Sequence, residues 1–497
     1  MQQSVAKLFG YVCQWLCVIL LGLPVSVIYF ILHLQNYVRK LRLQTAKHVD
    51  GEVGHFHGGQ MVEIRNVSTK EQIDFMTYRS PTYIKQLLFG SLWEFSKLTG
   101  SQQSVPLIDD HVLHHVILNS VFCHGLIKGD ENSDIEWRLP FTLENYHVFK
   151  GFYWDVSEIR LHHNHQLTIV DKTGKIHTQE SKTWNLAKAH AQAQLTFFAP
   201  GLAHNHVHFV FPSLVSSQVR KMLPPTSVLR QLLDPHTRFT QYINYQALNE
   251  CQSSKNTGSL IDRIFRPWLS FPISNDDFIG GIQKKCETFY YDNFTLTQEL
   301  HDELPYHAFL KSYCVIVRKF VEELEPLLKD DYAELFASMN TYLPSLTKHD
   351  LVDVITTLIW NCGVVHYSDH HSYLQQFAFK YGCMSMRIPL VQDDHSSSIN
   401  ATAEIPDSMN SDLGARASLF AAEDIYRTRC FLRTFVQYNG NPNLDMSLKC
   451  TKYDFTDKAA ISSAKSFLEG LTDLDSKLRQ RGNAILPLSN IIRSVCF

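Results

Sequence analysis

Two histidines placed one helical turn apart, at the end of a long apolar run, constrain this chain more than any other feature. Residues 351–360 carry apolar side chains with the period of a helix, and the pattern predicts that the helix continues through His366 and His370. Side chains four residues apart on a helix face the same way, about 6 Å from each other. Two imidazoles in this arrangement can bind one metal ion. Imidazole suits Zn, Cu, Fe and Ni, so the spacing alone does not name the metal.

This spacing is weak evidence by itself, because histidine is frequent in the chain. With 25 histidines among 497 residues, chance predicts about one pair at i and i+4. The residues around each pair must therefore decide which pairs belong to a site. The sequence contains His111/His115, His204/His208 and His366/His370 at this spacing.

The residues that follow His370, and those that end the chain, resemble a known family. His366 and His370 are followed by Met-Arg-Ile-Pro at residues 386–389, and the chain ends in Ile-Ile-Arg-Ser-Val-Cys-Phe at residues 491–497. This order is similar to the second metal-binding helix and the C-terminus of lipoxygenases. The resemblance implies a non-haem iron that is bound by histidines and by the terminal carboxylate, here that of Phe497.

Further motifs in the family's order extend the resemblance over residues 184–497. Residues 184–188 read Trp-Asn-Leu-Ala-Lys, similar to the Trp-x-x-Ala-Lys that opens the first metal-binding helix of lipoxygenases. Residues 236–240 read His-Thr-Arg-Phe-Thr, similar to the family's His-x-Arg-[Tyr/Phe]-Thr segment. The resemblance implies a mainly α fold, with a lipoxygenase-like helical catalytic domain that we assign to residues 81–497.

The first metal-binding helix departs from the family pattern. Counting without gaps from the motifs on either side places its second ligand at His204 and its first at Ala199, and alanine cannot bind a metal. His208 is a replacement, because on a regular α-helix it faces the same way as His204. The predicted metal ligands are therefore His204, His208, His366, His370 and the carboxylate of Phe497, with no catalytic residue beyond the metal centre. Two alternatives stay open: a strand face formed by His204, His206 and His208, or a site that has lost its metal.

The N-terminal region predicts a membrane anchor. Residues 8–34 contain no Asp, Glu, Lys or Arg, and about 20 apolar residues suffice to span a bilayer. Four basic residues follow within residues 39–47 and one precedes the stretch, so the positive-inside rule places the C-terminal side in the cytosol. We expect a single-pass anchor rather than a signal peptide, because the apolar run is longer than the usual h-region. Residues 35–80 are interpreted as a linker or short strands.

Other stretches predict elements that frame the site. Residues 109–118 have the pattern of an amphipathic helix with an acidic first turn, and we interpret their histidine pair as a helix face. Residues 166–178 alternate around a glycine-containing turn and predict a β-hairpin. Residues 416–438 and 458–480 carry helical patterns.

Composition excludes some functions. The net charge of −3 gives no bulk basic character, so we expect no nucleic-acid partner. Eleven cysteines without a CxxC motif argue against a disulfide scaffold and for a reducing compartment.

The resemblance also implies a reaction. A non-haem iron dioxygenase of this kind abstracts a hydrogen atom from a polyunsaturated fatty acyl chain, and molecular oxygen adds to give a hydroperoxide. The expected cofactor is iron, with manganese as the alternative, and the expected partners are a lipid, molecular oxygen and a membrane. Ala199 favours an alternative, a catalytically altered or inactive protein of this fold that binds lipid or a partner. A third hypothesis is a metal-dependent oxidation other than lipid dioxygenation, at a reshaped site.

Overall fold

The chain divides into two compact units in the computed structural model. The smaller unit contributes few described residues: Val105, the first residue of strand β1 (Val105–Pro106), and strand β7 (Ser408–Met409), which pairs with β1. All other described elements belong to the larger unit. The structure describes residues 105–106, 110–141, 153–198, 207–208, 211–238, 240, 300–340, 350–373, 386, 389–390, 408–409, 447–482 and 485–495.

A five-stranded antiparallel sheet occupies the N-terminal part of the larger unit. Its strands are β2 (Ile127–Lys128), β3 (Ile135–Pro140), β4 (Val156–His162), β5 (Leu167–Asp171) and β6 (Ile176–His177), in that order across the sheet. Strands adjacent in sequence are therefore adjacent in space. The hairpin predicted at residues 166–178 is confirmed as β5 and β6, and Gly174 supplies the positive φ angle of 86° that their turn requires. The sequence did not predict the rest of this sheet.

Helix α5 (Trp184–Phe198), which contains the Trp-x-x-Ala-Lys motif, is buried along nearly its whole length and contacts β4 and β5. The Gln194 amide accepts a hydrogen bond from the Val156 N–H at 2.8 Å and donates one to the Val156 carbonyl at 2.7 Å. These bonds satisfy strand groups that burial removes from water.

The start of α5 is held by α4 (Asp110–Leu118), the helix predicted at residues 109–118. The Asp110 carboxylate accepts hydrogen bonds from Trp184 Nε1 at 3.1 Å and from Lys188 Nζ at 2.7 Å. Trp184 and Lys188, the first and last residues of the motif, therefore fix where α5 begins.

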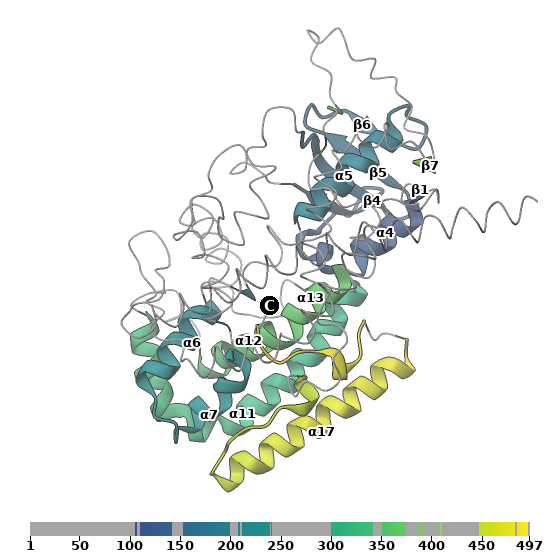
Figure 1. The fold of residues 1–497 in the computed structure, drawn as a ribbon. Coiled ribbons are helices and arrows are strands. Elements are labelled where there is room, and N and C mark those ends of the chain that lie inside the picture. The colour runs from purple at the N-terminus through teal and green to yellow at the C-terminus, as the bar shows by residue number, and fades with distance from the viewer. Residues whose placement is uncertain are drawn as a thin grey trace, which may run out of the picture. The chain divides into compact units, whose positions relative to one another are not determined.

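A long helix, α11 (Pro305–Asn340), organises the rest of the unit. At 1.5 Å per residue it is about 54 Å long, and its buried residues recur every three or four positions. It contacts 3-10 helix η2 (Val121–Gly125), α6 (Phe211–Met222), α7 (Val228–Thr237), α12 (Leu351–Trp360) and α17 (Lys458–Gln480). Figure 1 shows α17, in yellow, running along α11. The rings of Phe320 and Phe467 stack between these helices with centroids 4.3 Å apart.

The helix predicted to carry His366 and His370 is interrupted. Its first part, α12, begins at Asp350, whose side chain accepts a hydrogen bond from the Asp353 N–H at 2.7 Å. It is followed by a π-helical turn, η8 (Asn361–Val365), and then by α13 (His366–Tyr373). A π turn takes up one more residue than an α turn, so the histidines face a direction that an unbroken α-helix would not give them. The prediction of one continuous regular helix was wrong at this turn.

The mainly α character and the helix at 458–480 are confirmed for the described residues. The proposed anchor at residues 8–34, the linker at 35–80 and the helix at 416–438 lie outside the described residues. Among the helices that the structure describes, none is both long enough and apolar enough to cross a membrane. The assignment of residues 81–497 to one catalytic domain stays a prediction.

Capping of α17 gives a first test. The Asp457 carboxylate accepts hydrogen bonds from the N–H groups of Ala459 and Ala460, so Asp457→Ala should lower the free energy of unfolding by about 1 kcal/mol. Chemical denaturation followed by circular dichroism measures the change. Asp473→Ala, at an exposed position in the same helix, is the matched control and should have little effect. An equal loss in both variants would contradict the capping role.

Candidate metal centre

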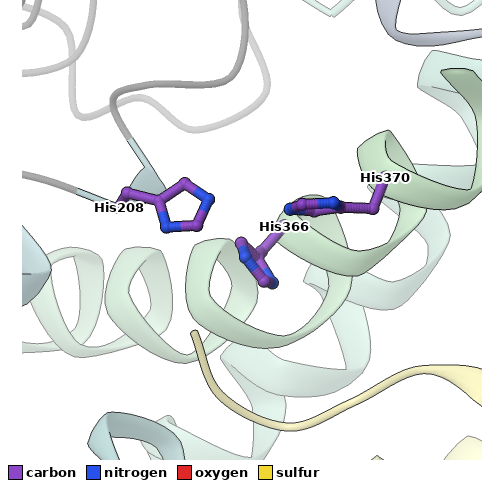
Figure 2. A group of neighbouring side chains, drawn as sticks. All are labelled: His208, His366 and His370. Atoms are coloured by element: carbon purple, nitrogen blue, oxygen red, sulfur yellow. The ribbon is translucent and has the colours of Figure 1, made fainter. Parts of the chain in front are cut away.

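Three histidines from two distant parts of the chain converge in the larger unit. His366 and His370 belong to α13, and His208 follows the buried Val207 in a short turn. One ring nitrogen of each residue can be chosen so that all three lie within 4.8 Å of one another. Figure 2 shows the three rings turned toward a common point.

The geometry suits a bound transition-metal ion. The ring centroid of His366 is 4.6 Å from those of both His208 and His370, and the centroids of His208 and His370 are 5.8 Å apart. Imidazole nitrogens bind metals at about 2.0–2.2 Å, so two ligands of one ion lie about 3 to 4 Å apart. The ring nitrogens lie within 4.8 Å of one another, close to that separation. The three residues therefore fit the metal that the sequence predicts.

Burial distinguishes this group from surface histidines. His366 is 0% exposed and His370 is 3% exposed, while His208 is half-buried. By contrast, His111 and His115 are exposed on α4, as expected for a helix face. Three imidazoles that meet at one point, two of them fully buried, can bind a transition-metal ion.

The structure brings together three of the five predicted ligands. His204 and Phe497 lie outside the described residues, so their roles stay predictions. Ala199 lies outside them as well. Val207 has 3-10 conformation, His208 is a turn residue, and neither lies in a strand. The strand-face alternative is therefore wrong for His208.

The C-terminal segment passes beside the ligand helix. A Cβ atom placed on Gly363, in the π-helical turn before His366, would lie 3.6 Å from the Arg493 carbonyl oxygen. Figure 2 shows this segment in yellow beneath the helix. The Ser494 hydroxyl donates a hydrogen bond to the Arg238 carbonyl at 2.9 Å. The tail is therefore fixed, through residue 495, beside the turn that leads into the site.

His236, from the His-x-Arg-Phe-Thr motif, is one of the side chains that hold this tail. Its Nδ1 lies 3.0 Å from the Arg493 carbonyl oxygen, and its Nε2 lies 2.9 Å from the Tyr453 hydroxyl. Complete burial lowers the pKa of His236 to about 3, so the ring is neutral. A carbonyl can only accept, so Nδ1 carries the proton and Nε2 accepts from Tyr453.

Sequence reasoning missed two functions next to the site. The motif containing His236 was recognised, but its role in holding the tail was not. Asp369, between His366 and His370, was not singled out at all. The sequence did contain a signal for Asp369. An aspartate beside two candidate ligands is expected to be buried with them, and a buried carboxylate requires hydrogen-bond donors from elsewhere in the chain.

Comparison with known proteins identifies the fold. Neither a protein-family description nor a curated protein sequence matches this chain. Among solved structures, a lipoxygenase variant determined anaerobically in complex with arachidonate matches with a TM-score of 0.64 and 13% identity, covering 93% of this chain and 81% of its own. The chain has a lipoxygenase-like fold.

Two further lipoxygenase structures agree. A calcium-dependent 11R-lipoxygenase has a TM-score of 0.58 at 14% identity, covering 78% of this chain and 66% of its own. A coral 8R-lipoxygenase has a TM-score of 0.57 at 13% identity, covering 79% of this chain and 68% of its own. The resemblance predicted from the motifs is thus confirmed for the fold.

The neutral His236 makes stability depend on pH. The unfolded chain protonates this histidine near pH 6.5, whereas the folded chain does so only near pH 3, so stability falls as the pH falls through this window. His236→Gln should reduce the slope of unfolding free energy by up to about 1.4 kcal/mol per pH unit between these limits. Denaturant titrations from pH 7 to pH 3.5 measure the slope.

The exposed His163 is the control for this experiment. His163→Gln should leave the slope unchanged, because His163 is exposed and the substitution leaves the buried His236 in place. A His236→Gln variant with the wild-type slope would show that His236 is not buried in its neutral form.

Proposed function

We propose that this protein is a non-haem metal-dependent oxygenase of lipids, which uses molecular oxygen to convert polyunsaturated fatty acyl chains to hydroperoxides. The observation that carries the proposal is the convergence of His208, His366 and His370 within a lipoxygenase-like fold. The arachidonate bound to one structural neighbour supports a fatty acyl substrate.

In this proposal one group of residues binds the metal ion and another excludes water from it. His208, His366 and His370 would hold the ion, and the predicted ligands His204 and Phe497 would complete its coordination. Iron, or manganese in its place, supplies the one-electron chemistry that the reaction requires. Imidazole binds a metal in its neutral form, so these three ligands would add no charge to the site.

The segment that leads into α13 is mostly apolar. Trp360 at the end of α12 and Val364 and Val365 in η8 are all buried. The Trp360 indole N–H donates a hydrogen bond to the Leu310 carbonyl at 2.8 Å, which fixes the end of α12 to α11. Apolar surroundings exclude water and suit a hydrocarbon substrate. The anchor predicted at residues 8–34 would keep the domain at a membrane, on its cytosolic side, where such substrates are found.

A second function is favoured by one observation. Ala199 stands where the family pattern has a histidine ligand, so a catalytically silent protein that binds lipid or a partner is the alternative. The two functions differ in metal content and in oxygen consumption. If the protein binds a metal but consumes no oxygen with fatty acids, a metal-dependent oxidation of another substrate is indicated.

Metal analysis of the purified full-length protein, expressed in iron-replete cells, tests the proposal. We expect near-stoichiometric iron or manganese and oxygen uptake with linoleate or arachidonate. His366→Ala should lose both, because it removes the central ligand of the group. The exposed His163→Ala variant should keep both, with circular dichroism verifying that each variant is folded. Folded wild-type protein without a bound transition metal would refute the oxygenase and favour the silent alternative.

A further inference from the structure

A buried carboxylate lies between the two histidines of α13. Asp369 is 1% exposed. Its Oδ1 accepts a hydrogen bond from the Tyr306 hydroxyl at 2.5 Å and lies 2.9 Å from Nε2 of His124. An ionised carboxylate is costly to bury unless donors replace its water, so these contacts stabilise it. At 100° per residue, Asp369 lies about 60° around the helix from His366, on the flank of the ligand face.

The hydrogen bonds that connect His301, His307 and His124 to Asp369 all run in one direction. The His301 backbone N–H, which can only donate, lies 3.1 Å from His307 Nδ1. Burial holds the pKa of His307 well below its ordinary value, so this ring is neutral and carries its proton on Nε2. That nitrogen lies 3.3 Å from His124 Nδ1, which therefore accepts. His124 must then carry its own proton on Nε2, facing Asp369. Every donor in this chain of residues points toward the carboxylate.

The network joins three elements. Tyr306 and His307 belong to the first turn of α11, His124 belongs to η2, and Asp369 belongs to α13. Two donors from different elements meet on one carboxylate oxygen, so they restrain rotation of α13 about its own axis. A rotation of about 20° would move an imidazole nitrogen by roughly 2 Å. Metal–ligand distances tolerate only about 0.2 Å, so this restraint determines whether the ligands meet.

The carboxylate also contributes charge. Burial and the nearby Asp369 charge together raise the pKa of the Cys123 thiol. An ionised carboxylate on the flank of the ligand face favours a cation at the site, because the interior screens the attraction less than water does. Orientation and charge therefore act in the same direction.

We propose that Asp369, held by Tyr306 and by the His307–His124 pair, is a positioning residue for the metal centre and sets the orientation of His366 and His370. The inference rests on the proposed metal site but not on the substrate. Residues that orient metal ligands commonly contribute 10- to 100-fold to metal affinity.

Titration of the metal-free full-length protein with Co²⁺ tests this role, because Co²⁺ absorption reports both affinity and coordination geometry. Asp369→Asn should weaken Co²⁺ binding about 10- to 100-fold and change the visible spectrum. Tyr306→Phe removes one donor and keeps the ring, so it should weaken binding by a smaller factor, with the same sense of spectral change. Thermal melting of each metal-free variant shows whether the fold is kept.

Tyr313→Phe is the matched control. Tyr313 lies on the same helix as Tyr306 and is equally buried, and its hydroxyl makes no hydrogen bond within the part of the chain that the structure describes. This variant should bind Co²⁺ like the wild type. If Asp369→Asn does not fold, Tyr306→Phe and His124→Gln decide the question, because each leaves the carboxylate in place.

The outcomes separate the two proposals. If the wild type binds no Co²⁺, the metal site is wrong and the positioning role falls with it. If the wild type binds and the folded variants match it in affinity and spectrum, only the positioning role is overturned. A lower melting temperature with unchanged Co²⁺ binding would overturn it as well, because the network would then be purely structural.

Discussion

Bringing three imidazoles to one point inside the protein is the constraint on which the larger unit depends. His366 and His370 can meet His208 only if α13 keeps both its position and its rotation. The apolar helix α12 and the indole of Trp360 fix the position, through packing on α11 and the bond to the Leu310 carbonyl. Apolar packing alone is poorly directional, because dispersion contacts have no preferred angle. Rotation needs directional bonds, and buried polar groups supply them.

The same physical rule fixes the segments around the site. Asp110 determines where α5 starts, Gln194 fixes α5 to the sheet, and His236 fixes the C-terminal tail beside α13. In each case a polar group that burial has removed from water recovers its hydrogen bonds from a segment distant in sequence. A misplaced segment would leave a donor or acceptor unsatisfied, at a cost of about 1–3 kcal/mol. These bonds add specificity to a core whose stability comes mainly from apolar burial.

Local patterns predicted what depends on local interactions. Helical periodicity was sufficient to predict α4, α12 and α17. A glycine-containing turn was sufficient to predict the hairpin of β5 and β6. The spacing of His366 and His370, together with the motifs that follow them, was sufficient to nominate a metal site. The π-helical turn was not predictable, because its hydrogen bonds to the fifth preceding residue are stable only in a particular packing environment. Asp369 was missed because its partners His124 and Tyr306 lie 245 and 63 residues away along the chain.

His208 shows why a ligand can change its place in the sequence while the site keeps its shape. A metal ion fixes the positions of donor atoms, not the backbone that delivers them. On α13 the helix determines the spacing, so neither His366 nor His370 can move independently. His208 lies in a short turn, where small changes in backbone angles carry the side chain over several ångströms. Under the proposed function, the loss of a ligand at Ala199 is therefore best compensated from this turn, while the half of the site on α13 stays as it is.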